Sequence, residues 1–149
     1  MNVSRRLGLE FLIASAAGLV FLVAPWVFLK QPAPVYPGFW MLAWLCVFSP
    51  ILEELAFRGF LQTEINRFFF RVKFRITLGN FLGSALFGLL HCVLYKNIAL
   101  LLVIFPSLIF GYFKDRSGSV TLPILLHVFY NAGYFGLFGV GFFYYYSPP

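Results

Sequence analysis

Residues 42–58 read LAWLCVFSPILEELAFR, an apolar run that closes on two adjacent glutamates and an arginine. With its flanks the run extends from about Phe39 through Gln62 to Arg67, long enough to cross roughly 30 Å of bilayer hydrocarbon. A charged side chain near mid-bilayer costs about 2.5–3.5 kcal/mol on insertion scales. Glu53 and Glu54 therefore need either partners or a chemical role.

The composition of the whole chain indicates a membrane protein. Hydrophobic residues make up 61% of the 149 residues and charged residues only 11%, whereas a soluble domain carries about 25% charged residues. The length allows a single domain, 1–149. The net charge of +6 comes from short basic stretches between apolar runs, which indicate membrane topology and not a nucleic-acid surface. Cys46 and Cys92 lie inside apolar runs and are expected to be buried thiols.

Apolar runs predict an all-α polytopic membrane bundle of about five transmembrane helices. The expected spans are 9–29, 39–67 including a cytoplasmic extension, 77–95, 98–113 and 120–146. The first run is too long for a secretory signal and no small-residue cleavage site closes it, so we interpret it as an uncleaved anchor.

Basic residues alternate between the segments that join these spans. Two of them lie in the second and fourth segments, whereas eight lie in the first, third and fifth: Arg5, Arg6, Arg67, Arg71, Lys73, Arg75, Lys114 and Arg116. The positive-inside rule then places the N-terminus in the cytoplasm. We expect an integral protein of a bacterial or archaeal plasma membrane.

The two glutamates have different expected surroundings. Arg58 follows Glu54 at i+4, a spacing that favours an ion pair at the end of the helix. Adjacent helical positions point about 100° apart. One glutamate can therefore pair with Arg58 while the other, Glu53, faces a cavity.

Both histidines of the chain also lie inside expected spans. His127 and Asn131 share one helix face at i, i+4, so they can hydrogen-bond toward one point. His91 follows Phe87 at the same spacing. A lone histidine on an apolar helix is usually a packing residue. Two imidazoles together with two carboxylates, a carboxamide and a guanidinium indicate hydrolysis, which needs a proton acceptor for water and donors for an oxyanion.

Several other hydrolytic mechanisms lack their motifs. The sequence has no His-Glu-x-x-His zinc motif and no Gly-x-Ser-x-Gly elbow. Its single aspartate, Asp115, falls in an expected loop. A serine, aspartyl or zinc-helix mechanism of the usual kind is therefore disfavoured.

These residues resemble the CPBP family, which joins CAAX prenyl endopeptidases with bacteriocin-processing and self-immunity membrane proteins. The family pattern is Glu-Glu-x-x-x-Arg, then Phe-x-x-x-His, then His-x-x-x-Asn or Asp, on three helices. The resemblance covers about 42–134. The matching residues are Glu53, Glu54, Arg58, Phe87, His91, His127 and Asn131.

The resemblance implies a glutamic-type intramembrane endopeptidase that needs no metal or other cofactor. Glu53 with His91 would activate a water, and His127 and Asn131 would stabilise the oxyanion. Glu54, Arg58 and Phe87 would support the site. Small relatives act on C-terminal sorting signals of surface proteins, so the expected partner is a membrane-anchored protein or peptide in the lipid bilayer, with prenylated CAAX substrates less favoured.

Two alternatives stay open at this point. Glu53, His91 and His127 could supply the ligands of a zinc protease. Intramembrane carboxylates and imidazoles also occur in proteins that are not enzymes, and some relatives are immunity or scaffold proteins.

The depths of the residues in the bilayer do not agree at first sight. Counting at 1.5 Å per residue places Glu53 about 21 Å from the outer end of its span, whereas His91 lies only a few residues from the outer end of the next. A shared water requires either a buried turn near 95–97 or a second span that begins deeper. We also expect water to reach the site from the cytoplasmic end of the second span, beside Arg58 and the basic segment that follows it.

Overall fold

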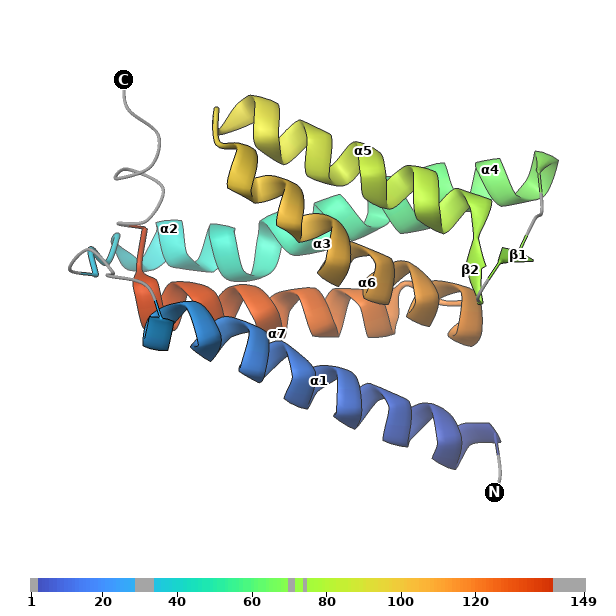
Figure 1. Cartoon of the computed structure of the whole chain (residues 1–149), viewed down its shortest axis with the longest axis horizontal. Coiled ribbons are helices and arrows are strands. Elements are labelled where there is room, and N and C mark those ends of the chain that lie inside the picture. The colour runs from blue at the N-terminus through green and yellow to red at the C-terminus, as the bar shows by residue number, and fades with distance from the viewer. Residues whose placement is uncertain (1–2, 29–33, 70–71, 74, 141–149) are drawn as a thin grey trace.

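The computed structural model describes residues 3–28, 34–69, 72–73 and 75–140, which form a helical bundle with one short hairpin (Figure 1). A 26-residue helix, α1 (Val3–Phe28), comes first. A continuous helical rod, Phe39–Phe68, follows, made of α2 (Phe39–Ala43), η1 (Trp44–Phe48), α3 (Ser49–Glu54), η2 (Leu55–Gln62) and α4 (Thr63–Phe68). Next come β1 (Val72–Lys73), β2 (Ile76–Thr77), α5 (Leu78–Leu94), η3 (Ile98–Val103), α6 (Ile104–Ser117) and α7 (Thr121–Phe138).

The expected all-α membrane bundle is confirmed. By length and composition, three helical segments in the described ranges could cross a membrane: Phe39–Phe68, Ile98–Ser117 and Thr121–Phe138. The helix α5 is apolar but has only 17 residues. The fourth expected span opens as the 3-10 helix η3 and ends at Ser117, four residues later than predicted, followed by Gly118 in the left-handed conformation. The fifth ends at Phe138, and the expected continuation beyond 140 lies outside the described residues.

The helices alternate in direction along the bundle (Figure 1). The start of α1, the β1–β2 hairpin and the α6–α7 turn lie at one end, which we call the basic end. The sequence places Arg5, Arg67, Lys73 and Arg116 there. The turn between α5 and η3 lies toward the other end and stops short of the start of α2 (Figure 1). This recessed turn accounts for the depths of Glu53 and His91, because the rod that carries Glu53 extends farther.

Apolar side chains cover the outside of the bundle, and polar ones fill much of its centre. Trp40 is 80% exposed, whereas Glu54, Arg58 and Asn80 are fully buried. A soluble protein shows the reverse distribution, and lipid explains this one.

An aromatic core fixes α1 against α6 and α7. Its buried members are Ala14, Phe110, Phe113, Leu126 and Tyr130. The Tyr130 hydroxyl donates to the Ala14 carbonyl at 2.8 Å. A Cβ on Gly18 would lie 2.2 Å from the Tyr130 ring, so only glycine lets this ring approach α1. The core therefore holds α7, and with it His127, in a fixed position.

Candidate active site

The rod Phe39–Phe68 carries both glutamates, and Pro50 shapes it one turn before them. In the π-helical segment η1 the Ser49 amide donates to the Trp44 carbonyl, five residues earlier, and Pro50 has no amide hydrogen to continue the ladder. The Leu45 carbonyl instead accepts from Asn131 Nδ2 at 2.9 Å. Asn131 thus binds the backbone of the rod with one amide hydrogen, a contact that the sequence did not predict.

Glu54 and Arg58 form the expected ion pair, entirely inside the bundle. Arg58 Nε lies 3.2 Å from Glu54 Oε2, and both side chains are fully buried. Arg58 Nη2 also donates to the Ser107 carbonyl at 3.0 Å and to the Ser107 hydroxyl. A buried ion pair is tolerated when further hydrogen bonds satisfy the two charges. Ser107 supplies such bonds from α6.

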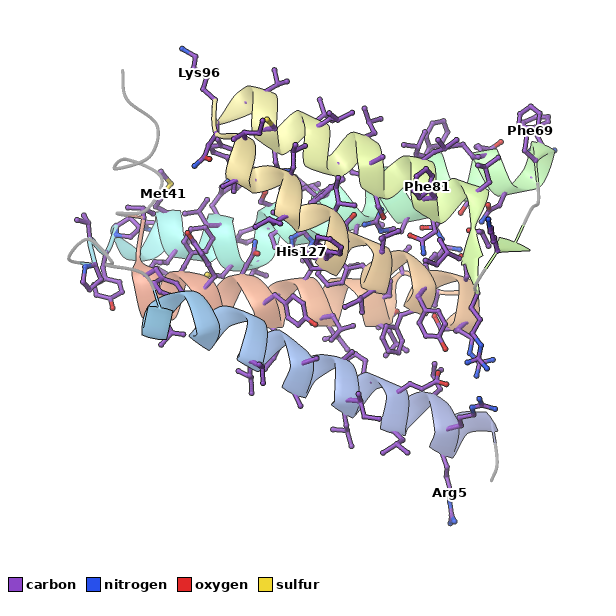
Figure 2. The ribbon with its side chains drawn as sticks, viewed as in Figure 1. Arg5, Met41, Phe69, Phe81, Lys96 and His127 are labelled. Carbon is purple, nitrogen blue, oxygen red and sulfur yellow. The ribbon has the colours of Figure 1, made fainter. Side chains whose placement is uncertain are left out.

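His127 lies between the two glutamates. Its Nδ1 is 2.9 Å from Glu54 Oε1, and its Nε2 is 3.7 Å from Glu53 Oε2. The Phe110 ring stacks on the imidazole with centroids 4.9 Å apart. Figure 2 shows His127 in the middle of the bundle, far from the labelled Arg5, Phe69 and Lys96 at its periphery. The sequence placed His127 on a helix face with Asn131, and its pairing with both carboxylates was not foreseen.

Glu53 is the accessible carboxylate of the pair. Its side chain is 27% exposed, in contrast to the fully buried Glu54. Ser49 Oγ, one turn earlier on the same rod, donates to Glu53 Oε1. The Oε2 atom faces His127. Together with the buried Glu54, Arg58 and His127 these residues form what we call the glutamate cluster: Ser49, Glu53, Glu54, Arg58 and His127.

Phe87 connects His91 to this cluster. The Phe87 ring lies 4.3 Å from the His91 ring and 5.9 Å from the His127 ring, by centroids, and Arg58 Cζ lies 5.8 Å from the Phe87 centroid. His91 Nδ1 is 2.9 Å from the Phe87 carbonyl. In the described part of the chain His91 makes no hydrogen bond or ion pair with Glu53. His91 is therefore adjacent to the cluster through Phe87 and contacts neither glutamate by a polar bond.

A second polar group, which the sequence did not predict, lies toward the basic end of the same rod. Asp115 accepts from Gln62 at 2.8 Å, from Thr77 at 2.8 Å and from Asn66 at 3.2 Å. Asn80 donates to the Leu108 carbonyl at 3.0 Å. We call these residues the Asp115 cluster: Gln62, Asn66, Thr77, Asn80 and Asp115.

Glycines let the Asp115 cluster form between closely packed helices. A Cβ on Gly111 would lie 2.0 Å from Asn80 Oδ1, and one on Gly79 would lie 2.5 Å from the Gln62 carbonyl. The start of α5 therefore packs closely against the rod at Gly79. Arg58 is fully buried, and the next residues toward the basic end are the buried Gln62 and Asn80. The burial of these side chains does not support the expected entry of water beside Arg58.

The glutamate cluster holds the groups that hydrolysis requires. An accessible carboxylate can take a proton from water, and a buried imidazole that carries hydrogens on both ring nitrogens can donate from Nδ1 to a carboxylate and from Nε2 to an oxyanion. Among the described residues, no three His, Cys, Asp or Glu side chains gather as ligands for a metal ion. Cys46 and Cys92 are free thiols, and both are half-buried, not fully buried as the sequence had suggested.

The fold and the site define a polytopic membrane protein whose polar residues face one another inside the helical bundle. Residues 34–133 match the type II CAAX prenyl endopeptidase Rce1-like family. The match includes all three motifs and two thirds of the chain, so the protein belongs to this family of membrane endopeptidases, as the resemblance suggested. No curated protein and no solved structure matches the chain.

Proposed function

We propose that the protein is a glutamic-type intramembrane endopeptidase that hydrolyses a peptide bond in a membrane-anchored substrate. The observation that carries this proposal is the contrast between the two glutamates. Glu54 is buried and paired with Arg58, whereas Glu53 is partly exposed beside His127. Paired titratable groups with different surroundings commonly divide the acid and base roles of an active site.

In the proposed reaction Glu53 takes a proton from water as the water oxygen attacks the substrate carbonyl carbon. His91, fixed by the Phe87 carbonyl, would hold this water from the opposite helix. His127, as an imidazolium with a hydrogen on each ring nitrogen, would donate from Nε2 to the oxyanion, and the second Nδ2 hydrogen of Asn131 would donate to it as well. The C–N bond then breaks, and Glu53 returns its proton to the leaving amine. Attack by water itself requires no covalent enzyme intermediate.

Glu54, Arg58 and Phe87 support this arrangement without touching the substrate. Glu54 orients the imidazole through Nδ1, as the carboxylate of a catalytic triad does. Arg58 balances the charge of Glu54 in the bundle interior. The Phe87 ring packs against the rings of both histidines.

We also propose that the reaction uses no metal ion. The alternative ligand set was Glu53, His91 and His127, and His91 makes no polar contact with the other two in the described structure. Cleavage by the purified protein should continue in excess EDTA or 1,10-phenanthroline. Loss of cleavage that added zinc restores would contradict this part of the proposal.

We propose a C-terminal sorting signal of a membrane-anchored protein as the substrate, and an N-terminus in the cytoplasm of a bacterial or archaeal plasma membrane. Processing of membrane proteins should be compared in cells with wild type and Glu53→Gln at matched membrane levels. The expected result is a C-terminally trimmed surface protein that is absent in the variant. Identical surface proteomes would contradict the sorting-signal proposal, and cleavage of a prenylated CAAX peptide instead would favour the substrate after which the family is named.

A further inference from the structure

The Ser49 hydroxyl holds one oxygen of the Glu53 carboxylate. Ser49 Oγ donates to Glu53 Oε1, one helical turn later on the rod. The other oxygen, Oε2, lies 3.7 Å from His127 Nε2. A hydrogen bond to a charged acceptor is stronger than one between neutral groups. The orientation of Glu53 in the site therefore depends on Ser49, which none of the three family motifs includes.

Two other helical serines of this chain use their hydroxyls differently from Ser49. A serine inside a helix commonly donates back to the carbonyl four residues earlier. Ser15 does so to the Phe11 carbonyl at 3.0 Å, and Ser117 to the Phe113 carbonyl at 2.7 Å. For Ser49 the equivalent acceptor is the Leu45 carbonyl, which already accepts from Asn131.

The need for Asn131 at the Leu45 carbonyl follows from the sequence around Pro50. The Ser49 amide donates to the Trp44 carbonyl, and Pro50 has no amide hydrogen. The Leu45 carbonyl would thus lack its helical donor, and an unpaired carbonyl within a bilayer costs several kcal/mol. Either Asn131 or the Ser49 hydroxyl can satisfy it. Because Asn131 does, the Ser49 hydroxyl is not needed at this carbonyl and donates to Glu53.

We propose that Ser49 is a positioning residue for Glu53, and that Asn131 keeps the Ser49 hydroxyl available by occupying the Leu45 carbonyl. This inference rests on the proposed role of Glu53 as the base. Ser49 touches neither the substrate nor the water. It holds Oε1 so that Oε2 stays directed into the site beside His127.

An isosteric pair of variants at position 49 tests the first half of the proposal. Ser49→Thr keeps the hydroxyl and should retain kcat within about twofold. Ser49→Val and Ser49→Ala remove it and should lower kcat about tenfold with KM unchanged, because substrate contacts are intact. Ser15→Ala, which removes a back-bonded helical hydroxyl elsewhere, should leave both constants unchanged.

The outcomes separate this inference from the proposed function. Wild-type kcat in Ser49→Val and Ser49→Ala, with Glu53→Gln inactive, would overturn the role of Ser49 alone. Full activity in Glu53→Gln would overturn the proposed function itself. An equal fall in Ser49→Thr and Ser49→Val would show that packing at position 49 matters and the hydroxyl does not, which also contradicts the proposal.

A double-mutant cycle tests the part played by Asn131. In Asn131→Ala the Leu45 carbonyl loses its donor, and Ser49 should turn back to it. The additional Ser49→Ala change should then lower kcat less than twofold, compared with tenfold in the wild-type background. A full tenfold further loss in the Asn131→Ala background would show that Ser49 acts on Glu53 independently of Asn131.

Discussion

Two polar clusters lie along the rod Phe39–Phe68, about two turns apart, and they differ in the surroundings of their carboxylates. In the Asp115 cluster amides and hydroxyls donate to one carboxylate, and glycines let the helices close around them. In the glutamate cluster two carboxylates compete for one imidazole, and one of them is accessible. The first arrangement fastens helices together. The second leaves Glu53 with capacity to accept a proton, which is what chemistry requires.

The comparison predicts the largest loss of stability for a change at the buried Glu54–Arg58 ion pair of the glutamate cluster. Arg58→Leu should lower the free energy of unfolding by about 3–5 kcal/mol, because Glu54 would keep a buried charge without its counter-ion. Thermal unfolding in detergent measures this loss. Arg67→Leu is the control, because its pair with Glu64 is exposed and should change stability by less than about 1 kcal/mol. Equal losses in the two variants would contradict the buried-pair account.

A smaller loss is expected from crowding the Asp115 cluster. Gly111→Ala should destabilise by about 1–3 kcal/mol, because its Cβ would lie 2.0 Å from Asn80 Oδ1 and force the amide away. Gly8→Ala in α1 meets nothing within 4 Å and should stabilise the helix slightly. If Gly111→Ala unfolds at the wild-type temperature, the cluster is packed more loosely than we describe.

The smallest effect is expected outside both clusters. The Tyr112 hydroxyl donates to Glu10 Oε2 at 2.9 Å and so attaches the start of α1 to α6. Tyr112→Phe should lower stability by about 1 kcal/mol and leave kcat unchanged. A change in kcat as large as that of a glutamate-cluster variant would show that the position of α1 affects the geometry of the active site.

The sequence predicted the glutamate cluster better than the Asp115 cluster, for a physical reason. Charges inside apolar spans are rare enough to be noticed one at a time, and the i+4 spacing of Glu54 and Arg58 already predicted their pair. Asp115 lies where the fourth span was expected to have ended, so its partners on the rod and in β2 could not be predicted. Its one signal was periodic: Ser107, Gly111 and Asp115 recur at four-residue spacing on one face.

The contacts of Pro50 and Asn131 also needed the structure. A proline in a span predicts a break in the hydrogen-bond ladder, but not which side chain repairs it. The helix count and most boundaries followed from apolar runs, whereas the β1–β2 hairpin did not, because its strands have only two residues each. The depth of the recessed α5–η3 turn is set by how helices of unequal length pack against one another. Residue spacing within a single helix does not determine that packing.

One paired measurement tests the central claim that the glutamate cluster performs the chemistry and the Asp115 cluster holds the helices. Purified wild type, Glu53→Gln and Asp115→Asn should be compared for kcat on one cleaved substrate at low temperature and for Tm. We predict that Glu53→Gln loses kcat by about 10³-fold at an unchanged Tm, since general-base catalysis contributes 10²–10⁴-fold. Asp115→Asn should lose Tm and keep kcat within about threefold. The reverse pattern, with cleavage surviving Glu53→Gln and lost in a folded Asp115→Asn, would contradict the account.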